Sequence, residues 1–180
     1  MRIRDSLPGL FLAAVMGTST TINAGQSAEQ IAQRMISSGQ AQDHAELASV
    51  FDRLEAVDAD FMLGVWRGGK FDGGKGPDPI NWFGKRFVSR DQVDPLLVHA
   101  PNATVTVFRK LGDARLREVR FRGKTSASLI YDKQPIMDYF RRVSDDTVIG
   151  WGEVKGKDEV LFFYLTRAPD TKVVEETELK

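Results

Sequence analysis

The stretch Phe61-Met62-Leu63-Gly64-Val65-Trp66-Arg67-Gly68-Gly69 decides the fold that this sequence predicts. Its first part is a short apolar run typical of a β-strand, and it holds a glycine and a tryptophan two residues apart. Side chains two residues apart lie on the same face of a strand, so Gly64 permits a close approach where Trp66 covers the core. Gly64, Trp66 and Gly68 therefore form a structural motif that suits the first strand of a small closed barrel, with the tryptophan as its plug.

The chain after this stretch alternates short strands with polar turns. Glycine and proline interrupt residues 68–79, and pairs such as Gly112-Asp113 and Asp145-Asp146 mark later turns. Such strands form an up-and-down meander, and closure into a barrel removes its exposed edges. We therefore predict a mainly β fold, a single antiparallel up-and-down β-barrel preceded by two helices. The predicted strands are residues 61–66, 81–88, 96–99, 104–108, 116–121, 126–131, 136–143, 147–153 and 160–167.

The barrel is predicted to span residues 58–168, in a first block over residues 58–100 and a second block over residues 101–168. Some of its strands are apolar on both faces, most clearly residues 160–165. One face can line the interior, and the other must be covered either by the helices or by a second copy of the chain in a homodimer. A charged tail over residues 169–180 follows, and we expect it to fray.

The segment before the barrel has two parts. Residues 1–25 run from a basic start through an apolar stretch to small polar residues, which is the order of a secretory signal peptide. Asp5 and Pro8 are atypical of such a signal, and the alternative is an unstructured extension. If residues 1–24 are removed we expect a periplasmic or secreted protein, and otherwise a cytoplasmic one.

Residues 26–57 carry the signals of two helices. Ser27 is a suitable N-cap for the first helix, and Gly39 is a suitable end for it. Asp43 precedes the second helix, in which apolar residues recur at helical spacing. We expect this helix to cover the barrel.

The composition narrows the classes of function. The 180 residues include 25 Lys+Arg and 25 Asp+Glu, so the formal net charge is zero and nucleic acid is not expected as a partner. The chain has no cysteine, which excludes disulfides, thiolate catalysis and cysteine-ligated metals. The apolar stretch near the N-terminus is too short to span a bilayer, so no transmembrane segment is expected.

Several blocks of the chain resemble a known family. Gly64-Val65-Trp66-Arg67-Gly68 resembles the motif that names the GXWXG domain family, and Trp82-Phe83-Gly84-Lys85-Arg86-Phe87 is similar to its second block. Later blocks resemble the uncharacterised domain that usually follows it, at residues 120–132, 135–141, 145–150 and 162–165. This resemblance implies a calycin-like barrel of the lipocalin and fatty-acid-binding kind, and it carries over no catalytic residue.

The predicted ligand-binding residues combine aromatic rings with cationic tips. An arginine that points into the barrel needs an anionic partner, because an unpaired buried charge is very costly. We predict Arg86 or Arg141 as the anchor for a carboxylate or phosphate, whereas an arginine on the outer face would simply be solvated. Tyrosine hydroxyls would assist in binding the same polar group. All of the predicted ligand-binding residues except Tyr139 would border one cavity. The set is Trp82, Arg86, Tyr131, Tyr139, Phe140 and Arg141.

These features favour the binding of a small hydrophobic or amphipathic molecule, such as a fatty acid or phospholipid. Two alternatives remain open at this stage: an enzyme that acts on a lipophilic molecule through carboxylates or tyrosine, and a structural dimer with a filled barrel. The sequence indicates no catalytic residue, no metal site and no cofactor. A G-x-W start is also similar to nitrobindin-type haem proteins, which use a histidine late in the barrel. Haem is disfavoured because no histidine follows His99.

Overall fold

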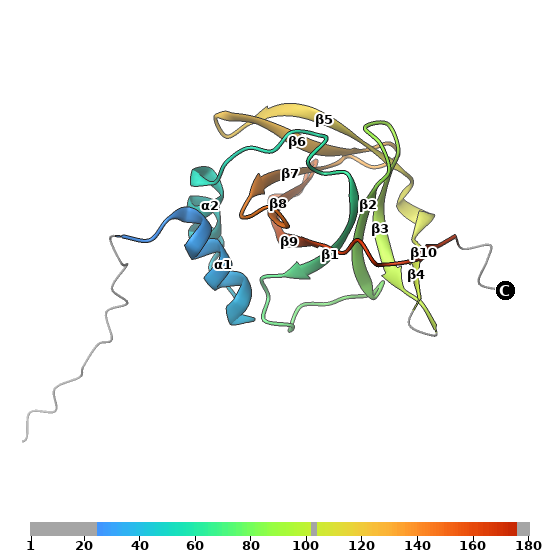
Figure 1. Ribbon diagram of the computed structural model, residues 1–180, viewed down its shortest axis with the longest axis horizontal. Helices are drawn as coiled ribbons and strands as arrows, with labels where there is room; N and C mark the ends of the chain where they lie inside the picture. The colour runs from blue at the N-terminus through green and yellow to red at the C-terminus, as the bar shows by residue number, and fades with distance from the viewer. Residues whose placement is uncertain (1–24, 102–103, 176–180) are drawn as a thin grey trace, which may run out of the picture.

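The computed structural model of the chain describes residues 25–101 and 104–175. The expected signal peptide or extension at residues 1–25 lies, apart from Gly25, outside the described residues. Viewed almost end-on, the described chain is a ring of strands with α1 and α2 against one side and β4 and β10 on the opposite side (Figure 1).

Both helices are capped as their sequences predict. α1 (Ala28–Ser38) begins at Ser27, whose side chain accepts a backbone hydrogen bond from the first turn, and it ends at Gly39, which has a φ of 60°. α2 (His44–Arg53) begins at Asp43, whose carboxylate accepts hydrogen bonds from two backbone N–H groups of the first turn. The prediction of these three capping residues is confirmed.

The strands form one sheet that closes on itself, and all neighbouring strands of the closed barrel are antiparallel. Within the described residues, eight strands make the barrel: β1 to β3 and β5 to β9 follow one another around it, and β9 returns to pair with β1. The predicted fold class, a closed antiparallel barrel after two helices, is confirmed. The elements are β1 (Gly64–Lys70), β2 (Trp82–Phe87), β3 (Val93–His99), β4 (Val105–Val107), the 3₁₀ turn η2 (Arg109–Leu111), β5 (Ala114–Phe121), β6 (Lys124–Tyr131), β7 (Ile136–Arg142), β8 (Thr147–Val154), β9 (Leu161–Arg167) and β10 (Val173–Val174).

The seam between β3 and β5 is the weakest join of the barrel. Among the described residues, the ladder there consists of the single pair Val93 and Ala114. β4 pairs instead with the second half of β3, and β10 pairs with β4 in the parallel direction. The expectation that the tail frays is therefore wrong for its described part, because Val173–Val174 is bonded into the sheet.

The first strand begins later than predicted and continues through its glycines. It runs over Gly64–Lys70, whereas the preceding residues form a turn. Gly68 and Gly69 belong to the strand because both pair with β9. They must be glycines, since a Cβ atom would lie 2.3 Å from the Trp82 ring at Gly68 and 2.1 Å from the Tyr164 ring at Gly69. These glycines make room for aromatic rings of the neighbouring strands instead of ending the strand.

Large apolar side chains fill the half of the barrel where β1 begins. Trp66 is completely buried there, and its indole N–H donates to the carbonyl of Met62 at 2.7 Å. The guanidinium of Arg167, at the end of β9, lies 4.3 Å from the Trp66 ring and donates to the Leu63 carbonyl at 3.0 Å. Trp66 thus closes this end of the barrel and ties the first strand to the last.

The helices cover the outer face of β7, β8 and β9 (Figure 1). Phe51 of α2 packs 5.5 Å from Trp151 of β8, and His44 packs 5.5 Å from Phe162 of β9, measured between ring centroids. The sequence left two possible covers for this face, the helices or a second copy of the chain, and the helices lie on it. A homodimer is not needed to bury it and stays a prediction.

Candidate ligand-binding site

The half of the barrel opposite the plug contains a cavity of about 340 Å³. The end of β1, the loop over residues 77–80 and the start of β9 surround it. Protein sites for small molecules are typically hollows of a few hundred Å³ with apolar walls and a few polar groups, and this cavity has both properties. Its apolar wall includes Trp82, Leu96, Leu111, Val154, Leu161 and Phe163.

Three polar side chains meet at the inner end of this cavity: Lys85 from β2, Tyr131 from β6 and Asp138 from β7. Lys85 Nζ lies 2.8 Å from Asp138 Oδ2, and the two side chains are only 4% and 6% exposed. The same ammonium donates to the carbonyl oxygen of Pro95 at 3.0 Å and to the Tyr131 hydroxyl oxygen at 3.4 Å. We refer to Lys85, Tyr131 and Asp138 as the polar trio.

Burial and pairing set the charges of the polar trio. Burial by itself disfavours the Lys85 ammonium, but the charge of Asp138 and the contact with Tyr131 outweigh it, and the pKa of Lys85 is raised. Burial raises the pKa of Tyr131 to about 12, against the opposing effect of the nearby ammonium. At neutral pH Lys85 therefore keeps its charge beside Asp138, and the Tyr131 phenol keeps its proton.

A local irregularity of β2 turns Lys85 into the barrel. The pairing of β2 with β3 shifts register on both sides of Gly84, so Trp82 and Lys85 face inward although they are three residues apart. Gly84 is required at this point because a Cβ atom there would lie 1.9 Å from the carbonyl oxygen of Trp66. Beyond the irregularity, Arg86 faces outward and Phe87 faces the core.

The structure separates the predicted site residues into three places. Trp82 and Tyr131 line the cavity. Phe140 is completely buried in the filled half, with its ring 5.8 Å from that of Phe87. Arg86, Tyr139 and Arg141 lie outside the barrel wall, so the predicted set does not border one cavity.

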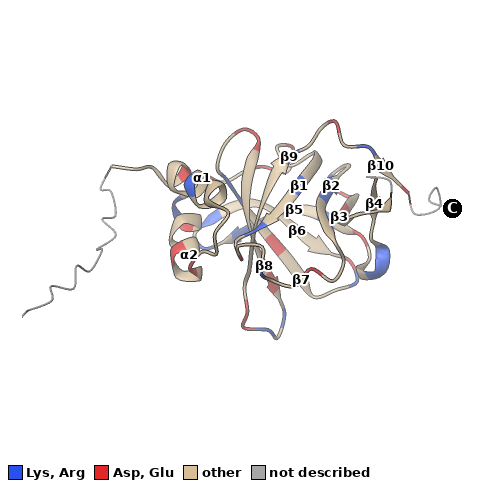
Figure 2. Cartoon of the chain, turned by 90° about the horizontal axis from the view of Figure 1, so that it is seen from below, with Lys and Arg blue, Asp and Glu red and all other residues tan. Residues whose placement is uncertain are grey.

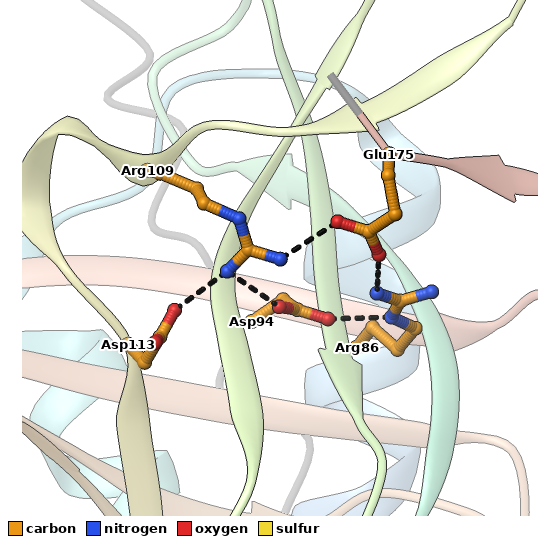
Figure 3. Close-up of polar contacts among 5 residues, drawn as sticks. All are labelled: Arg86, Asp94, Arg109, Asp113 and Glu175. Carbon is orange, nitrogen blue, oxygen red and sulfur yellow. Dashed lines mark hydrogen bonds and ion pairs between the residues drawn. The ribbon is translucent and has the colours of Figure 1, made fainter. Parts of the chain in front are cut away.

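Arg86 belongs to an ionic network on the outer wall (Figure 3). Its guanidinium contacts Asp94 at 2.5 Å and Glu175 at 2.8 Å, and Glu175 also pairs with Arg109 at 2.7 Å. Arg109 reaches Asp113 at 2.8 Å. The network fastens the segment after β10 to β2, β3 and the turn before β5, and the charge of Arg86 is used there rather than inside the barrel.

Arg141 lies beneath the second helix. It is 1% exposed, its guanidinium lies 4.7 Å from the Phe51 ring, and it donates to the carbonyl oxygens of Phe140 and Phe121. Burial lowers its pKa, although Asp52 partly opposes the effect. Arg141 is therefore enclosed between α2 and the sheet, on the opposite face of β7 from the cavity.

Tyr139 also points outward from β7. Its ring stacks on that of Phe121 at 3.7 Å, and its hydroxyl donates to Glu153 at 3.3 Å. It borders an outer hollow of about 540 Å³ beside the turn between β8 and β9. This hollow is larger than the interior cavity, but it contains no ion pair as deeply buried as that of Lys85 and Asp138, among the residues described. We therefore take the interior cavity as the candidate site.

Two members of the polar trio, Lys85 and Asp138, were missed by sequence reasoning. Strand alternation offered a signal for Asp138. It places Asp138 and Phe140 on one face of the strand and Tyr139 and Arg141 on the other. No comparable signal existed for Lys85, since the register shift at Gly84 reverses the alternation between Trp82 and Arg86.

Charges elsewhere on the molecule are mixed in sign. In Figure 2 blue and red segments follow one another along the strands and turns, and many of them are paired across neighbouring elements. In the part of the chain that the structure describes, no helix has the length and hydropathy needed to cross a membrane. The described residues also contain no group of three or more His, Asp or Glu side chains placed to hold a metal ion.

The fold and the site define a closed eight-stranded β-barrel protein with a small interior cavity. The GXWXG protein family matches residues 49–102, and the domain of unknown function DUF4334 matches residues 112–167. A protein from Thermomonospora curvata, known from its crystal structure, is 50% identical, covers 78% of this chain and 98% of its own chain, and superposes with a TM-score of 0.73. No curated protein matches the chain. The chain belongs to the GXWXG protein family, with the DUF4334 region following, and the resemblance stated from the sequence is confirmed.

Proposed function

We propose that this protein binds a small, mostly apolar molecule in the interior cavity of the barrel. The observation that carries the proposal is the combination of apolar walls with the buried polar trio at the inner end. Apolar walls supply affinity for a ligand, and a few fixed polar groups orient it.

The half of the barrel that contains the cavity is not built for maximum stability. A buried ion pair such as that of Lys85 and Asp138 usually contributes no more to stability than apolar residues of the same volume, because both charges must be taken out of water. Unfilled interior volume also lowers stability, at roughly 24 cal/mol per Å³ in measured cavities. A barrel shaped only for stability would be filled at both ends.

The rim of the cavity adds a second indication. Leu161, at the start of β9, lines the cavity and is 55% exposed. Single exposed apolar residues are ordinary, but one at the mouth of an apolar cavity is well placed to contact a ligand as it enters. The volume of about 340 Å³ lies near the lower end of the range for ligand sites and favours one compact or medium-chain molecule over a two-chain phospholipid.

Native mass spectrometry of protein purified without denaturation tests the proposal. We expect an additional mass from a bound small molecule, and its loss after denaturation and refolding. Leu161→Trp should obstruct the rim and reduce ligand occupancy. The matched control is Val88→Trp, because Val88 is 48% exposed and lies outside the cavity lining. A single mass equal to that of the chain, together with no binding of added apolar probes, would contradict the proposal and favour a filled barrel.

A further inference from the structure

The polar trio also limits which polar group a ligand can carry. A lysine ammonium has three protons to share. Lys85 donates to the Pro95 carbonyl oxygen at 3.0 Å and to the Tyr131 hydroxyl oxygen at 3.4 Å. Its charge is paired with Asp138 Oδ2 at 2.8 Å, an oxygen that accepts no hydrogen bond among the described residues. The cation at the inner end of the cavity is therefore occupied by the protein itself and is not a free anchor for an anion.

The Tyr131 hydroxyl has the opposite property. Its oxygen accepts a hydrogen bond from Lys85, but among the described residues no atom accepts the proton of this hydroxyl. Tyr131 lines the cavity and is 7% exposed, so this proton is available to a molecule in the cavity and to little else. Donation by a charged ammonium to the phenol oxygen polarises the O–H group and strengthens the hydrogen bond it can donate.

The charge balance disfavours an anionic ligand. The charge of Lys85 is paired with that of Asp138. Lys70 also lines the cavity, but it donates to the Pro77 carbonyl oxygen at 3.0 Å and lies 3.6 Å from Asp72. A carboxylate entering the cavity would therefore lose its hydration without gaining an unpaired cation. It would also approach the like charge of Asp138, which lines the same cavity. A neutral molecule meets neither penalty.

We infer that the cavity selects neutral, mostly apolar molecules that carry one hydrogen-bond acceptor, such as an alcohol or a ketone, and that Tyr131 is the residue that recognises this oxygen. The inference rests on the proposed function, because it concerns the ligand of the same cavity. It departs from the anionic amphiphile expected from the sequence, since the only cation lining the inner end is already paired, within the described part of the chain.

Calorimetric titration at pH 7 with four soluble probes tests the inference: 2-octanone, 1-octanol, octanoate and toluene. In the wild-type protein we expect 2-octanone and 1-octanol to bind at least tenfold more tightly than octanoate. Tyr131→Phe should weaken 2-octanone by about three- to tenfold, the effect of one hydrogen bond, and leave toluene unchanged. Asp138→Asn should reverse the order, because it leaves Lys85 with a free charge, and octanoate should gain at least tenfold.

The outcomes separate this inference from the proposed function. If none of the four probes binds, the proposed function fails. If toluene and octanoate bind and octanoate equals or exceeds 2-octanone in the wild-type protein, the cavity is a ligand site but the inference is wrong. An unchanged 2-octanone affinity in Tyr131→Phe would also overturn it. If Asp138→Asn does not fold, the wild-type order of affinities and the Tyr131→Phe titration still decide the question.

Discussion

The two halves of the same barrel differ in what their strands present to the interior. On β1 the inward-facing residue of the filled half is Trp66, and the next inward-facing residue, in the cavity half, is Gly68. On β7 the corresponding residues are Phe140 in the filled half and Asp138 in the cavity half. On β8 they are Val148 in the filled half and Gly150 in the cavity half. One half is therefore packed with large side chains, while the other presents small or polar ones and leaves a cavity.

This comparison shows that one set of strands can serve two purposes. The filled half fixes the first and last strands of the barrel to one another through Trp66 and Arg167, and it contributes most of the hydrophobic stabilisation inside the barrel. The glycines of the other half make room for the rings of Trp82 and Phe163, which wall the cavity. Stability should therefore be most sensitive to changes at the plug, and ligand affinity to changes at the cavity.

The largest expected effect comes from removing the plug. Trp66→Ala should lower the free energy of unfolding by about 3–5 kcal/mol, because it empties a fully buried site and removes the hydrogen bond to Met62. The matched variant Trp82→Ala should lower it by less than about 2 kcal/mol, since that ring already borders a cavity. Denaturant unfolding measures both, and equal losses in the two variants would erase the distinction between the halves.

A comparable effect is expected from breaking the buried ion pair. Lys85→Met leaves the Asp138 carboxylate without its cation at a site that is 6% exposed, which should destabilise the protein by about 3 kcal/mol or more. The double variant Lys85→Met with Asp138→Leu should recover most of this loss, because no unpaired charge remains. Unfolding of both variants at pH 7 measures the difference. A double variant no more stable than the single one would mean that the pair contributes to stability beyond mutual neutralisation.

The third expectation concerns alkaline pH. The pKa of Tyr131 in the folded protein is about 12, above the value of roughly 10 for an exposed tyrosine, so the folded state keeps a proton that the unfolded chain loses. This contribution is fully present below about pH 10 and is lost as the pH rises towards 12, by up to about 2.7 kcal/mol. The raised pKa of Lys85 acts in the same direction. Unfolding measured from pH 9 to 12 should show the decline, and Tyr131→Phe should reduce its slope. An unchanged slope would place the Tyr131 hydroxyl in water.

The general fold followed from local patterns, whereas the site depended on interactions between distant segments. Capping residues, turn signals and alternating strands predicted the two helices and the closed barrel because each depends on neighbours in the sequence. The inward position of Lys85 depends on how closely Gly84 approaches the backbone of Trp66 on another strand. Arg86 was predicted as an anchor because its carboxylate partners, Asp94 and Glu175, are brought to it only by the folded sheet and by β10.

The smallest effects are expected on the outer wall and complete the comparison with the cavity. Glu175→Gln should lower stability by no more than about 1 kcal/mol, because its side chain is 42% exposed and its ion pairs are partly screened by water. Arg86→Met should cost somewhat more, since it also leaves the buried Asp94 without its nearest cation. Neither change should alter the affinity for a probe such as 2-octanone, because both side chains lie outside the barrel (Figure 3). Titration of the two variants beside Tyr131→Phe makes the check direct. A loss of affinity in Arg86→Met that equals the loss in Tyr131→Phe would move the anchor back to the arginine and contradict the division between wall and cavity.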